Sequence, residues 1–192
     1  TSAAARYTNF WPMNRLARRW FDPCPDVTGM ASWRKLRLMS LIGSLLPADG
    51  SECYLEVGTY QGKSLVATLL GNPRLKAIAC DDFSEFDPQG TNVAALERNL
   101  ARHGLNDRVQ FFNMDFRKLL SGWRERGLPT VGAYFYDGAH DQVSQREGIS
   151  FAEPLLADRA IVVVDDWRLA RDSGSYAEAG TMEAIAASPN RW

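Results

Sequence analysis

Five short apolar runs, each followed by a segment with helical character, constrain the fold of this chain more than any other feature. The runs cover residues 53–57, 76–80, 108–113, 131–136 and 160–164. Strands that are apolar along their whole length are typical of parallel sheets covered on both faces. Strands that alternate with helices give such a sheet. We therefore predict a doubly wound α/β fold with a mainly parallel sheet and helices on both faces.

Capping and breaking residues predict where the helices lie. Ser32 is a suitable N-cap for a helix that ends before Pro47, and Gly104 is suited to follow the end of another. The expected helices cover residues 33–46, 65–70, 93–103, 117–126, 142–156 and 176–187. His103, at the end of the third, has a charge that the helix dipole favours, so we interpret it as structural.

The turn after the first run has the pattern Glu56-x-Gly58-x-x-x-Gly62. Glycines allow the backbone to turn tightly and approach a ligand, and the N-terminus of the next helix offers free N–H groups. The second glycine stands one place too late for the dinucleotide-binding Gly-x-Gly-x-x-Gly pattern. A tight strand-to-helix turn without a ligand gives the same pattern, so the turn alone does not decide between the two.

Acidic residues or the glycine turn follow the end of every predicted strand. Asp81 comes about twenty residues after the glycines, where a carboxylate can accept both hydroxyls of a ribose; the competing interpretation is a surface carboxylate. Asp115 either flanks a purine ring or caps the next helix. Asp137 and Asp165 end the fourth and fifth runs. Since ligands of open α/β sheets bind at the carboxyl ends of the strands, these positions predict one binding edge.

Four segments together resemble the class I S-adenosylmethionine-dependent methyltransferases, and within them the small-molecule O-methyltransferases of the family 24 type. They are residues 56–64, 80–86, 136–140 (Tyr-Asp-Gly-Ala-His) and 164–167 (Val-Asp-Asp-Trp), and the resemblance covers roughly residues 33–167. It implies a Rossmann-like fold, an S-adenosylmethionine cofactor and methyl transfer to a hydroxyl of a small molecule.

The resemblance also implies roles for particular residues. The cofactor would be held by Glu56, Gly58, Thr59, Tyr60, Gly62, Ser64, Asp81, Asp82, Asp115 and Asp137, with Asp81 at the ribose, Asp82 as second choice and Asp115 near the adenine. Metal-using members of the family hold Mg²⁺ with carboxylates at the positions of Asp137, Asp165 and Asp166. In some members a histidine at the position of His140 is the general base.

Two departures from the family pattern stand out. The family's sheet usually ends with two further strands, and no apolar runs for them follow Trp167, which predicts an exposed sheet edge or a different completion. Asp158-Arg159 replaces the usual Gly-Gly before the fifth strand.

Composition limits the cellular context and the partners. A net charge of −1 over 192 residues gives no global attraction to nucleic acid or membranes. Cys24, Cys53 and Cys80 show no Cys-x-x-Cys spacing and indicate a reduced, cytoplasmic protein. Residues 1–31 are aromatic, basic and broken by prolines, and we predict a lid or a dimer arm there, followed by the catalytic domain over 32–192.

The residue types at the predicted edge fit the chemistry of O-methylation. A hard cation on carboxylates lowers the pKa of a hydroxyl, and a histidine can take its proton. The competing interpretation is that the acids cap helices and His140 fastens its loop. Other classes also remain open: a module that binds a nucleotide without turnover, a nicotinamide-dependent oxidoreductase, which the glycine spacing disfavours, and an RNA methyltransferase.

Overall fold

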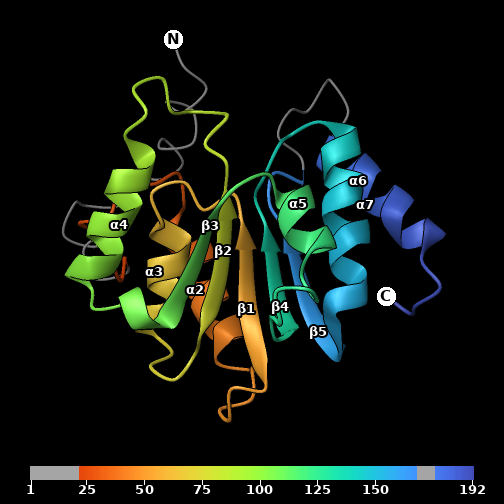
Figure 1. The fold of residues 1–192 in the computed structure, drawn as a ribbon, viewed down its shortest axis with the longest axis horizontal. Coiled ribbons are helices and arrows are strands. Elements are labelled where there is room, and N and C mark those ends of the chain that lie inside the picture. The colour runs from red at the N-terminus through yellow and green to blue at the C-terminus, as the bar shows by residue number, and fades with distance from the viewer. Residues whose placement is uncertain (1–21, 168–175) are drawn as a thin grey trace.

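The computed structural model describes residues 22–167 and 176–192, which contain one sheet of five parallel strands (Figure 1). The order is β3-β2-β1-β4-β5, and every neighbouring pair is parallel. The strands are β1 (Glu52–Val57), β2 (Ala77–Asp81), β3 (Val109–Asn113), β4 (Thr130–Tyr136) and β5 (Leu156–Val164). The predicted α/β fold with a parallel sheet is confirmed.

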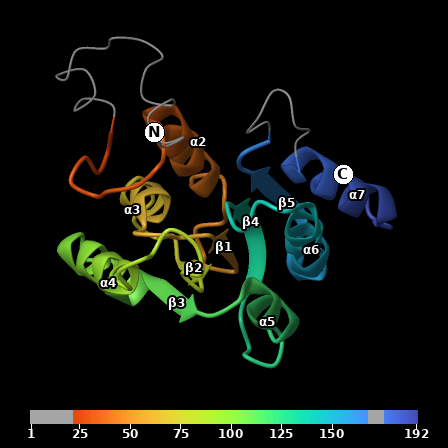
Figure 2. The same cartoon turned by 90° about the horizontal axis from the view of Figure 1, so that it is seen from above.

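Helices cover both faces of the sheet (Figure 2). One face carries α2 (Trp33–Gly43), α3 (Lys63–Leu70) and α4 (Asn92–Arg102), and the other carries α5 (Phe116–Ser121), α6 (Gln142–Ala152) and α7 (Tyr176–Ala187). Short 3-10 helices span Asn106–Arg108 and Glu153–Leu155. Ser32 caps α2 as predicted, because its side chain accepts a hydrogen bond from the Lys35 backbone N–H.

The alternation of side chains along each strand divides the core into two layers. Tyr54 and Phe135 are buried against α2 and α3, whereas Leu55 and Tyr136 are buried on the opposite face. Both layers are closed to solvent around β1 and β4, which explains the continuous apolar character of these strands in the sequence.

The strand order reverses between β1 and β4, although all the strands remain parallel. From β1 the chain moves outward to β2 and β3, and it then returns across β1 to β4 and β5. At such a switch point the loops after two neighbouring strands lead away to opposite faces, which opens a crevice at the carboxyl ends. The predicted site residues follow these strands.

Some predicted boundaries differ from the observed ones. The helix expected over residues 117–126 ends at Ser121, because Gly122 closes it and the chain turns until Gly127, which has a positive φ of 63°. The helix expected to reach Leu156 becomes a 3-10 turn at residue 153, next to Pro154, which lacks an N–H for helical bonding. The helix expected to run to residue 46 ends at Gly43.

The fifth strand is longer than predicted and lies at the edge of the sheet. It begins at Leu156 and includes the exposed pair Asp158-Arg159. Charged side chains are common on strands with one unpaired edge. Within the described ranges no sixth strand follows, and α7 instead packs against α6. The contact is close at Gly180, where a β-carbon would lie 2.4 Å from the Gln142 carbonyl oxygen.

The segment before α2 is fastened to α3. Cys24 and Val27 are buried in the core, and the buried ammonium of Lys63 donates to their carbonyl oxygens at 3.1 and 2.8 Å and pairs with Asp22 at 2.8 Å. The predicted lid or dimer arm falls largely on residues 1–21, which lie outside the described residues, and it stays a prediction.

All three cysteines are free and buried. None of the helices in the described ranges has the length and apolar character needed to cross a membrane.

Candidate active site

The glycine turn between β1 and α3 depends on backbone conformations that glycine adopts easily. Gly58 has a φ of 84° and Gly62 a φ of 85°, and Gly62 is the N-cap of α3. Tyr60, between them, is also left-handed at 49°. Thr59 is buried, and its hydroxyl lies 3.4 Å from the Cys80 carbonyl oxygen. The turn is therefore tied to the end of β2.

Glu56 is wholly buried beneath this turn. Its carboxylate accepts hydrogen bonds from the Tyr54 hydroxyl at 2.6 Å and the Ser64 hydroxyl at 2.9 Å. Burial raises the pKa of Glu56 to about 7, although both hydroxyl donors oppose that shift. The side chains of Glu56 and Ser64 therefore face each other inside the protein, and their described contacts support the turn.

Asp81 joins the second strand to the glycine turn. One carboxylate oxygen accepts the Tyr60 N–H at 2.7 Å, and the other accepts the Phe83 N–H at 2.8 Å. Burial raises the pKa of Asp81, and the two backbone N–H groups oppose the rise. Asp82 is exposed, and within the described part of the chain its carboxylate accepts the Ser84 N–H at 3.0 Å. Of the two acids, Asp81 is the one held beside the glycines.

Asp115 is the N-cap of α5. It accepts the Arg117 backbone N–H at 2.7 Å and pairs with the Arg117 guanidinium at 3.2 Å. Arg117 also reaches Glu147 and Ser144 on α6, at 2.5 and 2.8 Å. The capping alternative is therefore observed; a contact with adenine stays a prediction.

The acids after β4 and β5 lie side by side, as predicted. The Asp137 N–H donates to the Val57 carbonyl oxygen, and the Asp165 N–H donates to that of Tyr136, so the strand ladder places both residues. Asp166 follows with a positive φ of 51°, a conformation that Asp tolerates better than most residues. The sheet itself thus brings the three carboxylates to one edge.

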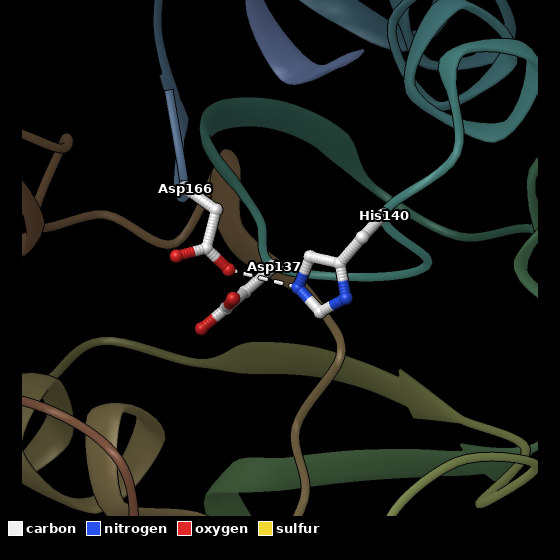
Figure 3. A group of neighbouring side chains, drawn as sticks. All are labelled: Asp137, His140 and Asp166. Carbon is white, nitrogen blue, oxygen red and sulfur yellow. Dashed lines mark ion pairs between the residues drawn. The ribbon is translucent and has the colours of Figure 1, made fainter. Parts of the chain in front are cut away.

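His140 completes a cluster with Asp137 and Asp166 (Figure 3). His140 Nε2 lies 2.8 Å from an Asp166 oxygen, and Nδ1 lies 3.7 Å from Glu85 in the loop after β2. Asp141 caps α6 directly after His140, and Gln145 donates to the Ala139 carbonyl oxygen, which positions the loop. The hydrogen bond to Asp166 raises the pKa of His140 and lowers that of Asp166.

Lys35 is a member of the site that the sequence did not reveal. From α2 its ammonium reaches Asp137 Oδ2 at 3.2 Å and pairs with Asp165 Oδ2. Burial lowers the pKa of Lys35, but the charges of Asp137 and Asp165 outweigh burial and raise it overall. Burial raises the pKa of Asp137, against the opposing charge of Lys35. A lone lysine in a helix, next to the buried Leu36, has no sequence pattern that distinguishes it.

The donor atoms fit a divalent cation. One oxygen or nitrogen atom from each of Asp137, His140 and Asp166 lies within 4.8 Å of the others. Mg²⁺ uses one or two carboxylates and keeps several water ligands, and imidazole also accommodates other divalent metals. The predicted third carboxylate, Asp165, lies outside this group and is paired with Lys35. The structure thus places His140 nearer a cation position than the sequence predicted.

A hollow at the other end of the sheet is a less suitable site. Its walls include Trp123, Arg124 and Arg159, at or near the amino ends of β4 and β5. Ligands of open parallel sheets bind at the carboxyl ends, where the acids and His140 gather. We therefore assign the candidate site to the carboxyl edge.

Comparisons with known proteins find the same fold in solved O-methyltransferases. One similar solved structure is the O-methyltransferase TomG from Streptomyces achromogenes, involved in tomaymycin synthesis, in complex with S-adenosylmethionine; it is 20% identical, with a TM-score of 0.65 over 97% of this chain and 77% of that one. An O-methyltransferase from Bacillus cereus in complex with S-adenosylhomocysteine is 16% identical, with a TM-score of 0.65 over 98% and 87%. No curated protein matches the sequence.

The match to a family extends from β1 to the end of the acidic cluster. The family model of a methyltransferase domain of type 24 matches residues 55–167, more than half of the chain. This range includes the glycine turn, Asp81, Asp137, His140 and Asp166. The resemblance predicted from the sequence is thereby confirmed, and the chain belongs to this family of methyltransferase domains.

Proposed function

We propose that the protein transfers a methyl group from S-adenosylmethionine to a hydroxyl of a small molecule. The observation that carries the proposal is the hydrogen bond of 2.8 Å between His140 and Asp166, next to Asp137 at the carboxyl edge. A histidine oriented by a carboxylate is suited to remove a proton from a hydroxyl. Asp137 is at the same time in backbone contact with the glycine turn, which brings the two parts of the site together.

The cofactor side is formed by the turn and the end of β2. S-adenosylmethionine supplies a methyl group on a positively charged sulfur, which leaves as the neutral thioether. Gly58 and Gly62 give the turn its left-handed backbone, and Tyr60 lies beside Asp81. Each Asp81 oxygen accepts one backbone N–H and keeps a free lone pair for a ribose hydroxyl. Glu56 and Ser64 support the turn from below.

The acceptor side uses His140 as the base. With Nε2–H donating to Asp166, the lone pair of Nδ1 is left to accept the proton of the acceptor hydroxyl. Nδ1 faces the loop after β2, where Glu85 lies 3.7 Å away and the exposed Phe86 meets the imidazole edge-on at 6.4 Å. Residues of this loop are therefore suited to contact the acceptor.

A divalent metal, Mg²⁺ in the first instance, is part of the proposal. Asp137 and Asp166 would hold it, joined by Asp165 once Lys35 releases that carboxylate. A bound cation there would lower the pKa of the acceptor hydroxyl and orient its oxygen. The alternative use of His140 as a ligand is distinguishable, because it predicts that metal affinity is lost together with the imidazole.

The test is turnover with a panel of catechols, phenols and sugars, measured as formation of S-adenosylhomocysteine and of the methylated product. The wild type, the wild type with EDTA, and His140→Ala are compared. We expect strong losses of turnover in the wild type with EDTA and in His140→Ala. The cofactor affinity of His140→Ala should stay within about threefold of the wild type, which is less than the roughly 1.4 kcal/mol of a tenfold change.

Each other outcome has a defined meaning. Full activity with EDTA rules out the metal, and an unchanged rate in His140→Ala rules out the base. Cofactor binding without turnover on any acceptor would favour a binding module. Methylation of RNA, with retention that weakens steeply with salt, would favour the nucleic-acid alternative.

A further inference from the structure

Lys35 places a positive charge inside the acidic cluster. Its side chain is 19% exposed, and its ammonium lies 3.2 Å from Asp137 and is paired with Asp165. The ammonium also lies 5.4 Å from the centre of the Phe135 ring on β4. Among the described residues, both hydrogen-bond partners of the ammonium are carboxylates that we propose as metal ligands.

Asp137 is shared between two cation positions. One is filled by Lys35, and the other lies among the donor atoms of Asp137, His140 and Asp166. Two positive charges this close repel each other, and the repulsion is strong where water is largely excluded. A divalent cation therefore binds fully only if the ammonium gives up Asp137.

We propose that Lys35 competes with the divalent metal for Asp137 and Asp165 and thereby sets the metal affinity of the cluster. The inference rests on the metal part of the proposed function. Lys35 holds the carboxylates together when no metal is bound, because three unpaired carboxylates would repel one another. The metal must displace Lys35, so the chain binds it more weakly than the carboxylates alone would.

Lys35 can move without disturbing the fold. Its neighbours Leu36 and Met39 are fully buried and fix α2 in the core, and Ser32 caps the helix. The flexible four-carbon stem of a lysine can then swing the ammonium toward solvent. After displacement the Lys35 ammonium can stay at the surface of the site.

The test is a titration with Mn²⁺, read from the electron paramagnetic resonance signal of the free ion. The variants are Lys35→Met, which keeps the stem without the charge, and Lys35→Arg, which keeps the charge. Lys76→Met removes the same charge from an exposed position at the other end of the sheet and is the matched control. Lys35→Gln replaces Lys35→Met if the latter does not fold, as judged by circular dichroism.

Loss of a charged hydrogen-bond partner corresponds to an affinity change of about 10- to 100-fold. We therefore expect Lys35→Met to bind Mn²⁺ about 10- to 100-fold more tightly than the wild type, and Lys35→Arg and Lys76→Met to bind it like the wild type. Adding Asp137→Asn to Lys35→Met should abolish the gain, which locates the ion. Equal affinities in the wild type and Lys35→Met would overturn the inference while the metal proposal survives. If no variant binds Mn²⁺, the metal proposal and the inference are both wrong.

Discussion

The α-carbon of Gly58 lies against the carbonyl group of Asp137. A β-carbon on Gly58 would lie 1.9 Å from that carbonyl oxygen, far inside van der Waals contact. The contact joins the turn proposed for the cofactor to the strand end that carries the acidic cluster. The two sides of the site are therefore held at a fixed separation by backbone atoms, which side-chain motion does not change.

Replacing Gly58 by alanine should disrupt the site. The variant has the strain of a left-handed alanine and the collision with Asp137, so we expect a loss of about 2–5 kcal/mol in the free energy of unfolding and no measurable cofactor binding. Gly50→Ala is the control, because Gly50 has a similar φ of 77° with no atom near the added carbon. It should cost roughly 1–2 kcal/mol and leave binding intact. Equal losses in urea unfolding would contradict the close contact.

Asp81 should contribute to cofactor affinity and Asp82 should not. Asp81→Asn removes a charged acceptor beside Tyr60, and we expect S-adenosylhomocysteine to bind about 10- to 100-fold more weakly in calorimetric titration. Asp82→Asn changes an exposed carboxylate, and its affinity for S-adenosylhomocysteine should stay within about threefold of the wild type. That is less than a tenfold change, which corresponds to about 1.4 kcal/mol. If neither variant alters affinity, the ribose assignment is wrong.

Glu56 should make stability depend on pH. Its pKa is about 7 in the folded protein against 4.5 ordinarily. Below pH 4.5 the group is protonated in both states, whereas between pH 4.5 and 7 only the unfolded state loses the proton, so stability falls as pH rises. The fall is on the order of 3 kcal/mol. Glu56→Gln should lose less stability than the wild type between pH 4.5 and 8 in urea unfolding; parallel curves would refute the shift.

The two interpretations of Asp115 can be separated by substitution. Asn caps helices about as well as Asp, whereas Ala does not, so Asp115→Ala should cost about 1 kcal/mol of stability and Asp115→Asn much less. Asp115→Asn also loses the ion pair with Arg117, which is partly exposed and contributes little. We expect cofactor affinity to change little in both. A marked loss of affinity in Asp115→Asn would instead favour contact with the adenine.

The sequence was most informative where neighbouring residues determine the outcome. Apolar runs and the glycine spacing predicted all five strands and the turn, because strand burial and backbone conformation are local properties. The cap at Ser32 was predicted for the same reason. Helix ends depended on competing turns, so that Gly122 and Pro154 ended helices earlier than periodicity indicated.

Contacts between distant segments could not be derived from spacing. Lys35 and Asp137 are 102 residues apart and meet only because α2 lies on the face of the sheet beside β4. Glu85 reaches His140 from a loop whose path no periodicity describes. Likewise, the strand order places Asp137 and Asp165 together. The direction of the Asp166 side chain toward His140 depends on the left-handed backbone at Asp166, which could not be predicted from the sequence.

Because the strand order reverses between β1 and β4, the residues proposed for the cofactor and those proposed for metal and base lie in separate stretches of the chain. Residues 52–113 contain the turn and Asp81, and residues 130–167 contain the acids and His140. Exchange of residues 130–167 alone would therefore change the acids and His140 and leave the turn and Asp81 intact, whereas the loop after β2, with Glu85 and Phe86, would still face the base. Such an exchange must preserve two joints, the backbone contact at Gly58 and the partner of Lys35 at Asp137. A hybrid of two related domains would keep an intact site only if both contacts were preserved.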